Sequence, residues 1–271
     1  MNVVINGVRY HVKQCGSGFP LLLLHGFTGD SSTWTPFCDS WGSHSQLIIP
    51  DIIGHGESDS PEDVNLYTME AAAQAIAGIL DHLAISQIDL LGYSLGGRLA
   101  LTFAFAYPER VRKLILESSS PGLVTEEERH QRQMNDAKLA NFIKENGIPA
   151  FVDYWENIPL FASMKSLPEK VRVKIREQRL QNSPIGLGNS LLGMGTGSQP
   201  SWWESLHKLS CDVMLMVGEK DQKFCSIAEQ MAVTIRNSSL VMIANCGHAI
   251  HVEDQEKFGT IVSDFLSKKK N

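Results

Sequence analysis

The 271-residue chain has little cysteine, and its cysteines follow no recognisable pattern. They are five in number, scattered, and never arranged as C-x-x-C. This distribution argues against a disulfide framework and against a zinc site, and it favours a reducing compartment. The cysteines are Cys15, Cys38, Cys211, Cys225 and Cys246.

An excess of basic residues and long apolar runs are also lacking. Lys and Arg number 24 against 30 Asp and Glu, a net charge of −6, so no general nucleic-acid-binding surface is expected. Apolar runs such as 20–24 and 47–50 are far shorter than the roughly 20 residues that cross a bilayer. Residues 1–13 alternate apolar and polar side chains, which predicts a strand pair rather than a signal peptide. We therefore expect a cytoplasmic protein without stable membrane insertion.

Short apolar runs bounded by turn residues alternate with helical patterns along most of the chain. This alternation predicts a mostly parallel, doubly wound α/β sheet with helices on both faces. Hydrophobic residues make up 43% of the chain, enough for a sizeable core. The expected strands are 21–24, 47–49, 88–91, 114–116, 213–217 and 240–243, and the expected helices are 69–83, 95–107, 227–235 and 254–267.

Residues 121–209 interrupt this alternation. The segment has helical patterns near 126–145, 149–155 and 168–181 but no convincing strand, and its glycine-rich run from Gly186 to Gly197 suggests flexible turns. We expect a core of residues 1–120 and 210–271 with a helical insertion at 121–209. Composition alone leaves open whether the insertion is a second core layer or a lid over a site.

The residues 92–96, Gly-Tyr-Ser-Leu-Gly, match G-x-S-x-G between an apolar run and a helical pattern. In this strand–turn–helix context a serine at a sharp, strained turn exposes its oxygen above the sheet. The turn needs small neighbours because it leaves no room for side chains beside the serine. Gly92, Gly96 and Gly97 meet this need, so Ser94 is the candidate reactive residue.

A serine hydroxyl needs an imidazole and a carboxylate to become reactive. Asp221 follows the expected strand 213–217, and His248 lies in the turn after the expected strand 240–243. Both lie just past the carboxyl end of a strand, where open parallel sheets bind ligands. Glu117, at the end of another expected strand, is an alternative acid, and His251 is an alternative imidazole. We favour Asp221 and His248.

The loop after the expected strand 21–24 contains His25, Gly26 and Phe27. A backbone N–H at this place can help to form an anion-binding oxyanion hole. We expect the amides of Phe27 and Leu95 to be the two donors, since Leu95 begins a helix whose unpaired N–H groups and dipole favour negative charge. His25 is expected to shape this loop and to lie at the substrate site.

Five motifs resemble those of the α/β-hydrolase superfamily over almost the whole chain. They are HGF at 25–27, D-x-x-G-H-G at 51–56, G-Y-S-L-G-G at 92–97, G-x-x-D at 218–221 and G-H at 247–248. The chain order Ser94, Asp221, His248 is also that of the superfamily. The resemblance implies an α/β-hydrolase fold with an inserted helical lid. It does not give the reaction, because this fold hosts esterases, C–C hydrolases and lyases.

Further segments resemble the 2-succinyl-6-hydroxy-2,4-cyclohexadiene-1-carboxylate synthases of menaquinone biosynthesis. They are YSLGGR at 93–98, LES at 116–118, PGL at 121–123, ERHQR at 128–132, DYW at 153–155, PLFAS at 159–163, REQRL at 176–180 and GEKDQKF at 218–224. The resemblance implies catalysis by Ser94, Asp221 and His248. It also implies a set of substrate-binding residues, to which we add His25: Tyr93, Arg98, Arg132, Trp155, Phe161 and Lys223.

The substrate of that family carries three carboxylates, so the resemblance implies a small anionic substrate and a basic site in an acidic protein. The implied reaction eliminates pyruvate from 2-succinyl-5-enolpyruvyl-6-hydroxy-3-cyclohexene-1-carboxylate, with Ser94 as the base. Alternatives are a serine carboxylesterase or C–C bond hydrolase with the same triad, and a non-catalytic binding module, against which the intact triad argues. No cofactor or metal is expected, and we expect a monomer or a weak homo-oligomer.

Overall fold

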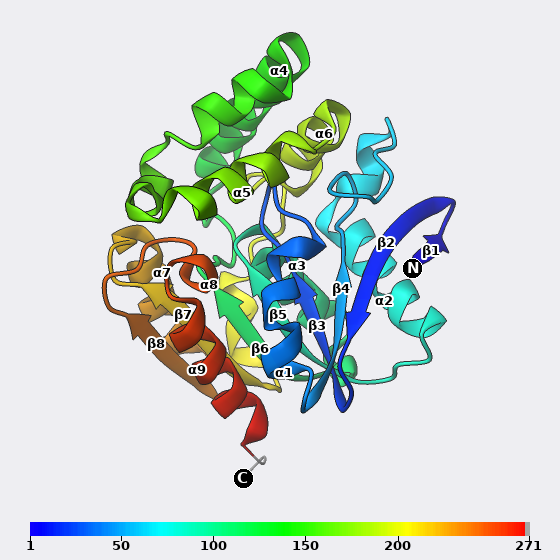
Figure 1. Cartoon of the computed structure of the whole chain (residues 1–271), viewed down its shortest axis with the longest axis vertical. Coiled ribbons are helices and arrows are strands. Elements are labelled where there is room, and N and C mark those ends of the chain that lie inside the picture. The colour runs from blue at the N-terminus through cyan, green and yellow to red at the C-terminus, as the bar shows by residue number, and fades with distance from the viewer. Residues whose placement is uncertain (269–271) are drawn as a thin grey trace.

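The computed structural model describes residues 1–268, in which eight strands form one sheet (Figure 1). The strand order is β1-β2-β4-β3-β5-β6-β7-β8. The strand β2 pairs antiparallel with β1 and with β4, and all other neighbours are parallel. The strands are β1 Asn2–Ile5, β2 Val8–Cys15, β3 Phe19–Leu24, β4 Ser45–Pro50, β5 Ile88–Tyr93, β6 Val111–Glu117, β7 Asp212–Gly218 and β8 Ser238–Ile243.

Helices cover both faces of the sheet. Side chains alternate along a strand, so Leu22 and Leu24 of β3 enter one apolar core while Leu21 and Leu23 enter the other. The helices α2, α3 and α7 contribute to the first core, and α1 and α9 contribute to the second. Their bounds, with that of the short helix α8, are α1 Cys38–Trp41, α2 Met69–His82, α3 Leu95–Ala106, α7 Gln222–Thr234, α8 Ile250–Glu253 and α9 Gln255–Ser267.

The predicted doubly wound sheet is confirmed. Every strand expected between residues 21 and 243 lies inside an observed strand, and residues 1–13 contain the expected strand pair. The helix α7 begins at Gln222 rather than at residue 227. The reason is a cap: the Asp221 carboxylate accepts a hydrogen bond from the N–H of Phe224 at 3.4 Å, which stabilises the first turn.

Residues 121–209 form three α-helices and two 3-10 segments, with the α-helices at the end of the sheet where the parallel strands stop (Figure 1). A kink at Gly147, where φ is 77°, separates two expected helices that are here parts of α4. Within the glycine-rich run 186–197, the expectation of a flexible turn is wrong up to Met194, because these residues belong to α6. The elements are α4 Glu126–Trp155, the 3-10 segment Pro159–Ser166, α5 Glu169–Leu180, α6 Pro184–Met194 and the 3-10 segment Trp203–Lys208.

The glycines of α6 serve close packing rather than flexibility. A Cβ atom on Gly186 would collide with the backbone of Gly54, in the loop after β4. Glycine is therefore required inside this helix where it rests on the core, in spite of the low helix propensity of glycine.

Cys15, the last residue of β2, and Cys38, the first residue of α1, form a disulfide. The expectation that the cysteines do not pair is therefore wrong for these two. The chain passes through α1 into β4, and β4 pairs with β2, so tertiary structure brings together residues whose separation of 23 carries no recognisable spacing. None of the helices within residues 1–268 is long and apolar enough to cross a bilayer.

Candidate active site

Ser94 lies in the sharp turn between β5 and α3. Its backbone has φ 51° and ψ −108°, a conformation that residues other than glycine rarely adopt and that is typical of functional sites. The N–H of Ser94 donates to the carbonyl of Glu117 at the end of the neighbouring strand β6, at 2.9 Å. A Cβ atom on Gly92 would collide with Gly96, so the turn depends on the missing side chain. The expected elbow is thus present.

His248 and Asp221 meet Ser94 above the strand ends. The His248 Nε2 atom is 3.0 Å from the Ser94 Oγ, and His248 Nδ1 is 2.6 Å from the Asp221 Oδ2. A carboxylate only accepts hydrogen bonds, so Nδ1 carries the proton and Nε2 accepts from the serine hydroxyl. The ring of His248 is almost fully buried and packs on Phe224 at 4.7 Å between centroids. This is the arrangement that activates a serine.

The alternative acid and the alternative imidazole lie outside this triad and bind each other. The His251 Nδ1 atom is 2.9 Å from Glu117 Oε1, and both side chains are buried. Within residues 1–268, Glu117 therefore does not orient His248, and no hydrogen bond joins His251 to Ser94.

Ser94 and His248 line a cavity of about 560 Å³ between the sheet and the insertion. Three cations from separate elements line the same cavity: Arg98 of α3, Arg132 of α4 and Lys223 of α7. Arg98 is buried and donates through Nη1 to the carbonyl of Met194 and to Gln199 Oε1, both at 2.6 Å. Burial, and to a lesser degree the charge of Arg132, lowers the pKa of Arg98.

The two other cations differ in how they are held. The Nε of Arg132 donates to both carboxylate oxygens of Asp136, at 2.8 and 2.9 Å. Lys223 is exposed, and no carboxylate within residues 1–268 forms an ion pair with it. The cavity therefore combines a reactive serine with positive charge, which suits an anionic ligand.

The aromatic residues implied by the resemblance surround this cavity. Tyr93, Phe161, Trp155 and Phe27 all line it, and the Phe27 and Trp155 rings lie 5.3 Å apart. The indole Nε1 of Trp155 is buried and has no hydrogen-bond partner among the described residues. A buried donor without a partner is costly, so a ligand acceptor at this place would be stabilised.

Phe27 and Leu95 both line the cavity beside Ser94. In residues 1–268, neither backbone amide donates to another group of the chain. His25 differs from its expectation as a substrate-binding residue. It is fully buried, and it lines neither this cavity nor the neighbouring one that contains His251. Its Nδ1 binds the carbonyl of Gly26 and its Nε2 accepts from the N–H of Ile52, so His25 holds the loop in shape.

Comparison with known proteins places this fold and site in a family. A model of the alpha/beta hydrolase fold matches residues 20–255. The chain belongs to the α/β-hydrolase family. It is 47% identical over 97% of its length to a candidate 2-succinyl-6-hydroxy-2,4-cyclohexadiene-1-carboxylate synthase of Bacillus subtilis (strain 168), of which it covers 97%. It is 30% identical to a synthase of the same name from Photorhabdus laumondii, with 91% of this chain and 85% of that protein covered.

Solved structures of α/β hydrolases match this chain over nearly its whole length. The structure of MenH from S. aureus has a TM-score of 0.92 and 36% identity, covering 97% of this chain and 99% of that one. A malate-bound esterase from Thermogutta terrifontis has a TM-score of 0.87 and 30% identity, covering 98% and 96%. The fold class expected from the sequence is confirmed.

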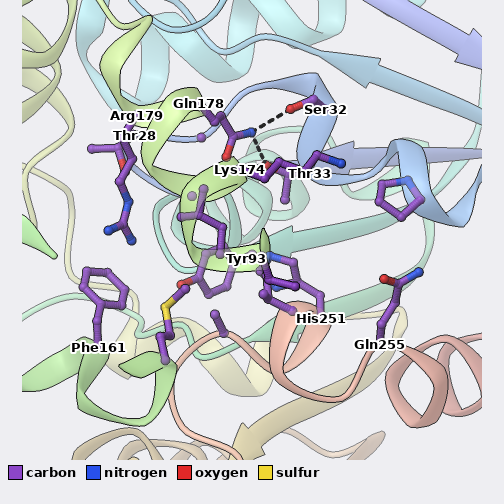
Figure 2. A pocket seen from close by; sticks show the side chains of 18 of the residues that line it. Thr28, Ser32, Thr33, Tyr93, Phe161, Lys174, Gln178, Arg179, His251 and Gln255 are labelled. Atoms are coloured by element: carbon purple, nitrogen blue, oxygen red, sulfur yellow. Dashed lines mark hydrogen bonds between the residues drawn. The ribbon is translucent and has the colours of Figure 1, made fainter. Parts of the chain in front are cut away.

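This α/β hydrolase also has a second cavity, of about 380 Å³, whose floor includes Tyr93 and His251 (Figure 2). It shares Phe27, Tyr93 and Phe161 with the first cavity. Arg179 of α5 lines it with only 7% of its surface exposed, and its guanidinium stacks over the Phe161 ring at 4.8 Å.

Our sequence analysis did not select Arg179 as a site residue. Burial lowers the pKa of its guanidinium, and no acidic side chain in the described residues lies within ion-pair distance of it. The segment REQRL at 176–180 contains Arg179, but the helix holds several other basic residues, and the sequence alone does not show which of them is buried at the site. Within residues 1–268, no cluster of His, Cys, Asp and Glu could hold a metal ion.

Proposed function

We propose that this α/β hydrolase is a lyase of menaquinone biosynthesis. It eliminates pyruvate from 2-succinyl-5-enolpyruvyl-6-hydroxy-3-cyclohexene-1-carboxylate and forms 2-succinyl-6-hydroxy-2,4-cyclohexadiene-1-carboxylate. The observation that carries the proposal is a serine triad in a cavity lined by Arg98, Arg132 and Lys223, in a chain 47% identical to a candidate synthase of this reaction. A substrate with three carboxylates matches these charges.

Proton abstraction starts the reaction. Ser94, through its hydrogen bond to His248, removes the proton next to the succinyl ketone, and His248 receives a proton from the serine. Asp221 holds the imidazole in the tautomer that accepts this proton and stabilises the imidazolium that forms. The serine acts as a base, so no acyl-enzyme is formed.

The electron pair left on carbon moves to the ketone oxygen, where the amides of Phe27 and Leu95 stabilise the enolate. A single donor of this kind is typically worth about 3 kcal/mol in a transition state. The enolate then re-forms the ketone, the ring double bond shifts, and the bond between ring carbon and enolpyruvyl oxygen breaks. The leaving group takes up the proton held by His248 and is released as pyruvate, so no water is consumed.

The two cavities give the substrate's carboxylates separate places. Arg98, Arg132 and Lys223 serve the groups near the ring, with the rings of Tyr93, Trp155 and Phe161 as apolar walls. Arg179 in the second cavity serves a carboxylate that reaches past Phe27 and Tyr93, which border both cavities. Guanidinium groups suit this task because their planar donors match a carboxylate.

The proposal extends to the setting of the enzyme. Residues 121–209 act as a lid over the core of 1–120 and 210–271, and the protein works in the cytoplasm without a cofactor. Both described cavities are lined by one chain, so a monomer or a weak homo-oligomer supports the reaction equally well.

Hydrolysis is the competing function. The chain is 27% identical over 98% of its length to a 2-hydroxymuconate semialdehyde hydrolase of Pseudomonas, and 30% identical to the Thermogutta esterase. The same triad serves such reactions, with water entering after Ser94 acts. The charges favour the lyase over an esterase for neutral substrates, because such an esterase needs an apolar acyl pocket.

A substrate panel tests the proposal. The wild-type protein is given the enolpyruvyl cyclohexene substrate, a neutral aryl ester and a dicarbonyl C–C hydrolase substrate, and pyruvate is followed by coupling to lactate dehydrogenase. We expect kcat/KM for pyruvate release to exceed the kcat/KM for the ester and for the C–C substrate by about 10³-fold or more. The reason is that a substrate without the matching carboxylates leaves the buried charges of the site without partners. Faster turnover of the neutral ester would contradict the proposal.

A further inference from the structure

The buried pair Glu117 and His251 joins the two segments that carry the reactive groups. The backbone carbonyl of Glu117 accepts from the N–H of Ser94 at 2.9 Å. Its side chain accepts from the backbone N–H of His251 at 3.0 Å and from the ring Nδ1 at 2.9 Å. His251 lies three residues after His248, in helix α8. One residue therefore binds the turn of Ser94 at one end and the segment of His248 at the other.

The pair is also in contact with the wall of the site. The His251 ring packs against Tyr93, the residue before Ser94, with 4.5 Å between centroids (Figure 2). On its other side it lies 4.9 Å from Trp34, which is fully buried. Tyr93 in turn lies 5.5 Å from the His248 ring. His251 thus holds the tyrosine that separates the two cavities.

The charge of Glu117 is not explained by packing stability. Its side chain has no exposed surface, and within residues 1–268 the one basic side chain at ion-pair distance is the imidazole of His251. A buried pair of this kind is often no more stable than an apolar pair of the same size. The presence of Glu117 at this buried position is best explained by the geometry that its three hydrogen bonds impose, one with Ser94 and two with His251.

We propose that Glu117 and His251 are positioning residues that set the distance between Ser94 and His248. The two-ended contact of Glu117 fixes the nucleophile turn relative to helix α8, and the His251 ring fixes Tyr93. Neither side chain is required to touch the substrate. The proposal concerns the triad and rests on the role proposed for Ser94, not on the identity of the substrate.

Two variants of one residue test this role. Glu117→Asp keeps the charge but shortens the side chain by one methylene, whereas Glu117→Gln keeps the length and removes the charge. A positioning role predicts that Glu117→Asp lowers kcat by about 10- to 100-fold, as expected for a misplacement of about 1 Å, with KM unchanged. Glu117→Gln should stay within about 3-fold of wild type, because its amide reaches the same partners.

A second readout separates this proposal from the proposed function. A fluorophosphonate forms a phosphorus–oxygen bond with an activated serine and releases fluoride, so its rate of reaction with Ser94 reports triad geometry without the natural substrate. The rate should fall in Glu117→Asp in the same proportion as kcat and be retained in Glu117→Gln. Labelling does not need the natural substrate, so a labelling rate that falls only in Glu117→Asp supports the positioning role even if the wild type releases no pyruvate, a result that would contradict the proposed function alone.

Several results would overturn the proposal. They are a folded Glu117→Asp with wild-type kcat and labelling rate, a larger loss in Glu117→Gln than in Glu117→Asp, or a rise in KM alone. If Glu117→Asp does not fold, His251→Asn gives the test from the other side, since it removes the ring that packs on Tyr93. That variant is expected to lose kcat and labelling rate in the same proportion, and unchanged values of both would overturn the proposal.

Discussion

Lys223, in the first turn of α7, is the most exposed of the three cations that line the cavity of Ser94. It lines the cavity of Ser94, and the Asp221 cap two residues earlier fixes the helix from which it projects. Within residues 1–268, its ammonium group forms no hydrogen bond with another residue. It lies 5.8 Å from the centre of the Phe224 ring. Its charge is therefore available to a ligand.

Replacing Lys223 by Met is expected to raise KM for the enolpyruvyl substrate by about 10-fold, the effect of losing one charge-assisted contact. The kcat should change little, because Lys223 takes no part in the hydrogen bonds of His248 to Asp221 and to Ser94. Lys220→Met is the matched control, since Lys220 is exposed on the same turn but lines neither cavity. Steady-state kinetics on both variants test this, and equal KM values in the two would contradict it.

At the scale of elements, α6 connects the insertion to the core. Its apolar residues Leu187 and Leu191 pack against α4 in a separate cluster, while Gly186 rests against the backbone of Gly54. The carbonyl of Met194, the last residue of α6, also accepts from Arg98 at 2.6 Å. The position of α6 thus affects both the insertion and a cation of the site.

Gly186→Ala is expected to destabilise the protein by about 1–3 kcal/mol, because the added methyl group overpacks the contact with Gly54. Gly188→Ala is the matched control in the same helix. Its new methyl group would meet its nearest neighbours at 3.9 Å, so helix propensity should make it neutral or stabilising by up to about 1 kcal/mol. Urea unfolding of both variants measures the difference. Two variants of equal stability would contradict this packing account.

The same helix shows what sequence reasoning can and cannot predict here. The sheet and the triad could be predicted because Ser94, Asp221 and His248 each lie in the turn that follows a parallel strand, so the local pattern fixes their place in space. The helix α6 could not, because its glycines are explained only by the distant loop at Gly54. The roles of Arg179 and of the Cys15–Cys38 disulfide likewise depend on contacts between remote segments.

For the whole molecule, the central feature is a basic site in an acidic protein. The chain has a net charge of −6, yet Arg98, Arg132 and Lys223 line the cavity of the triad and a buried Arg179 lines the adjoining one. The fold contributes the triad and two unpaired amides beside it, which are features that stabilise an enolate. The basic cavities, the triad and the two amides together explain how an α/β hydrolase can catalyse an elimination.

The most direct measurement is pyruvate release from the enolpyruvyl cyclohexene substrate by wild-type and Ser94→Ala protein, with a control without enzyme for spontaneous decay. The variant removes only the Oγ that His248 Nε2 contacts at 3.0 Å. We expect rapid release by the wild type and a loss on the order of 10³-fold or more in the variant, because triad members act as a unit. Release by Ser94→Ala at a rate near that of the wild type would contradict the account.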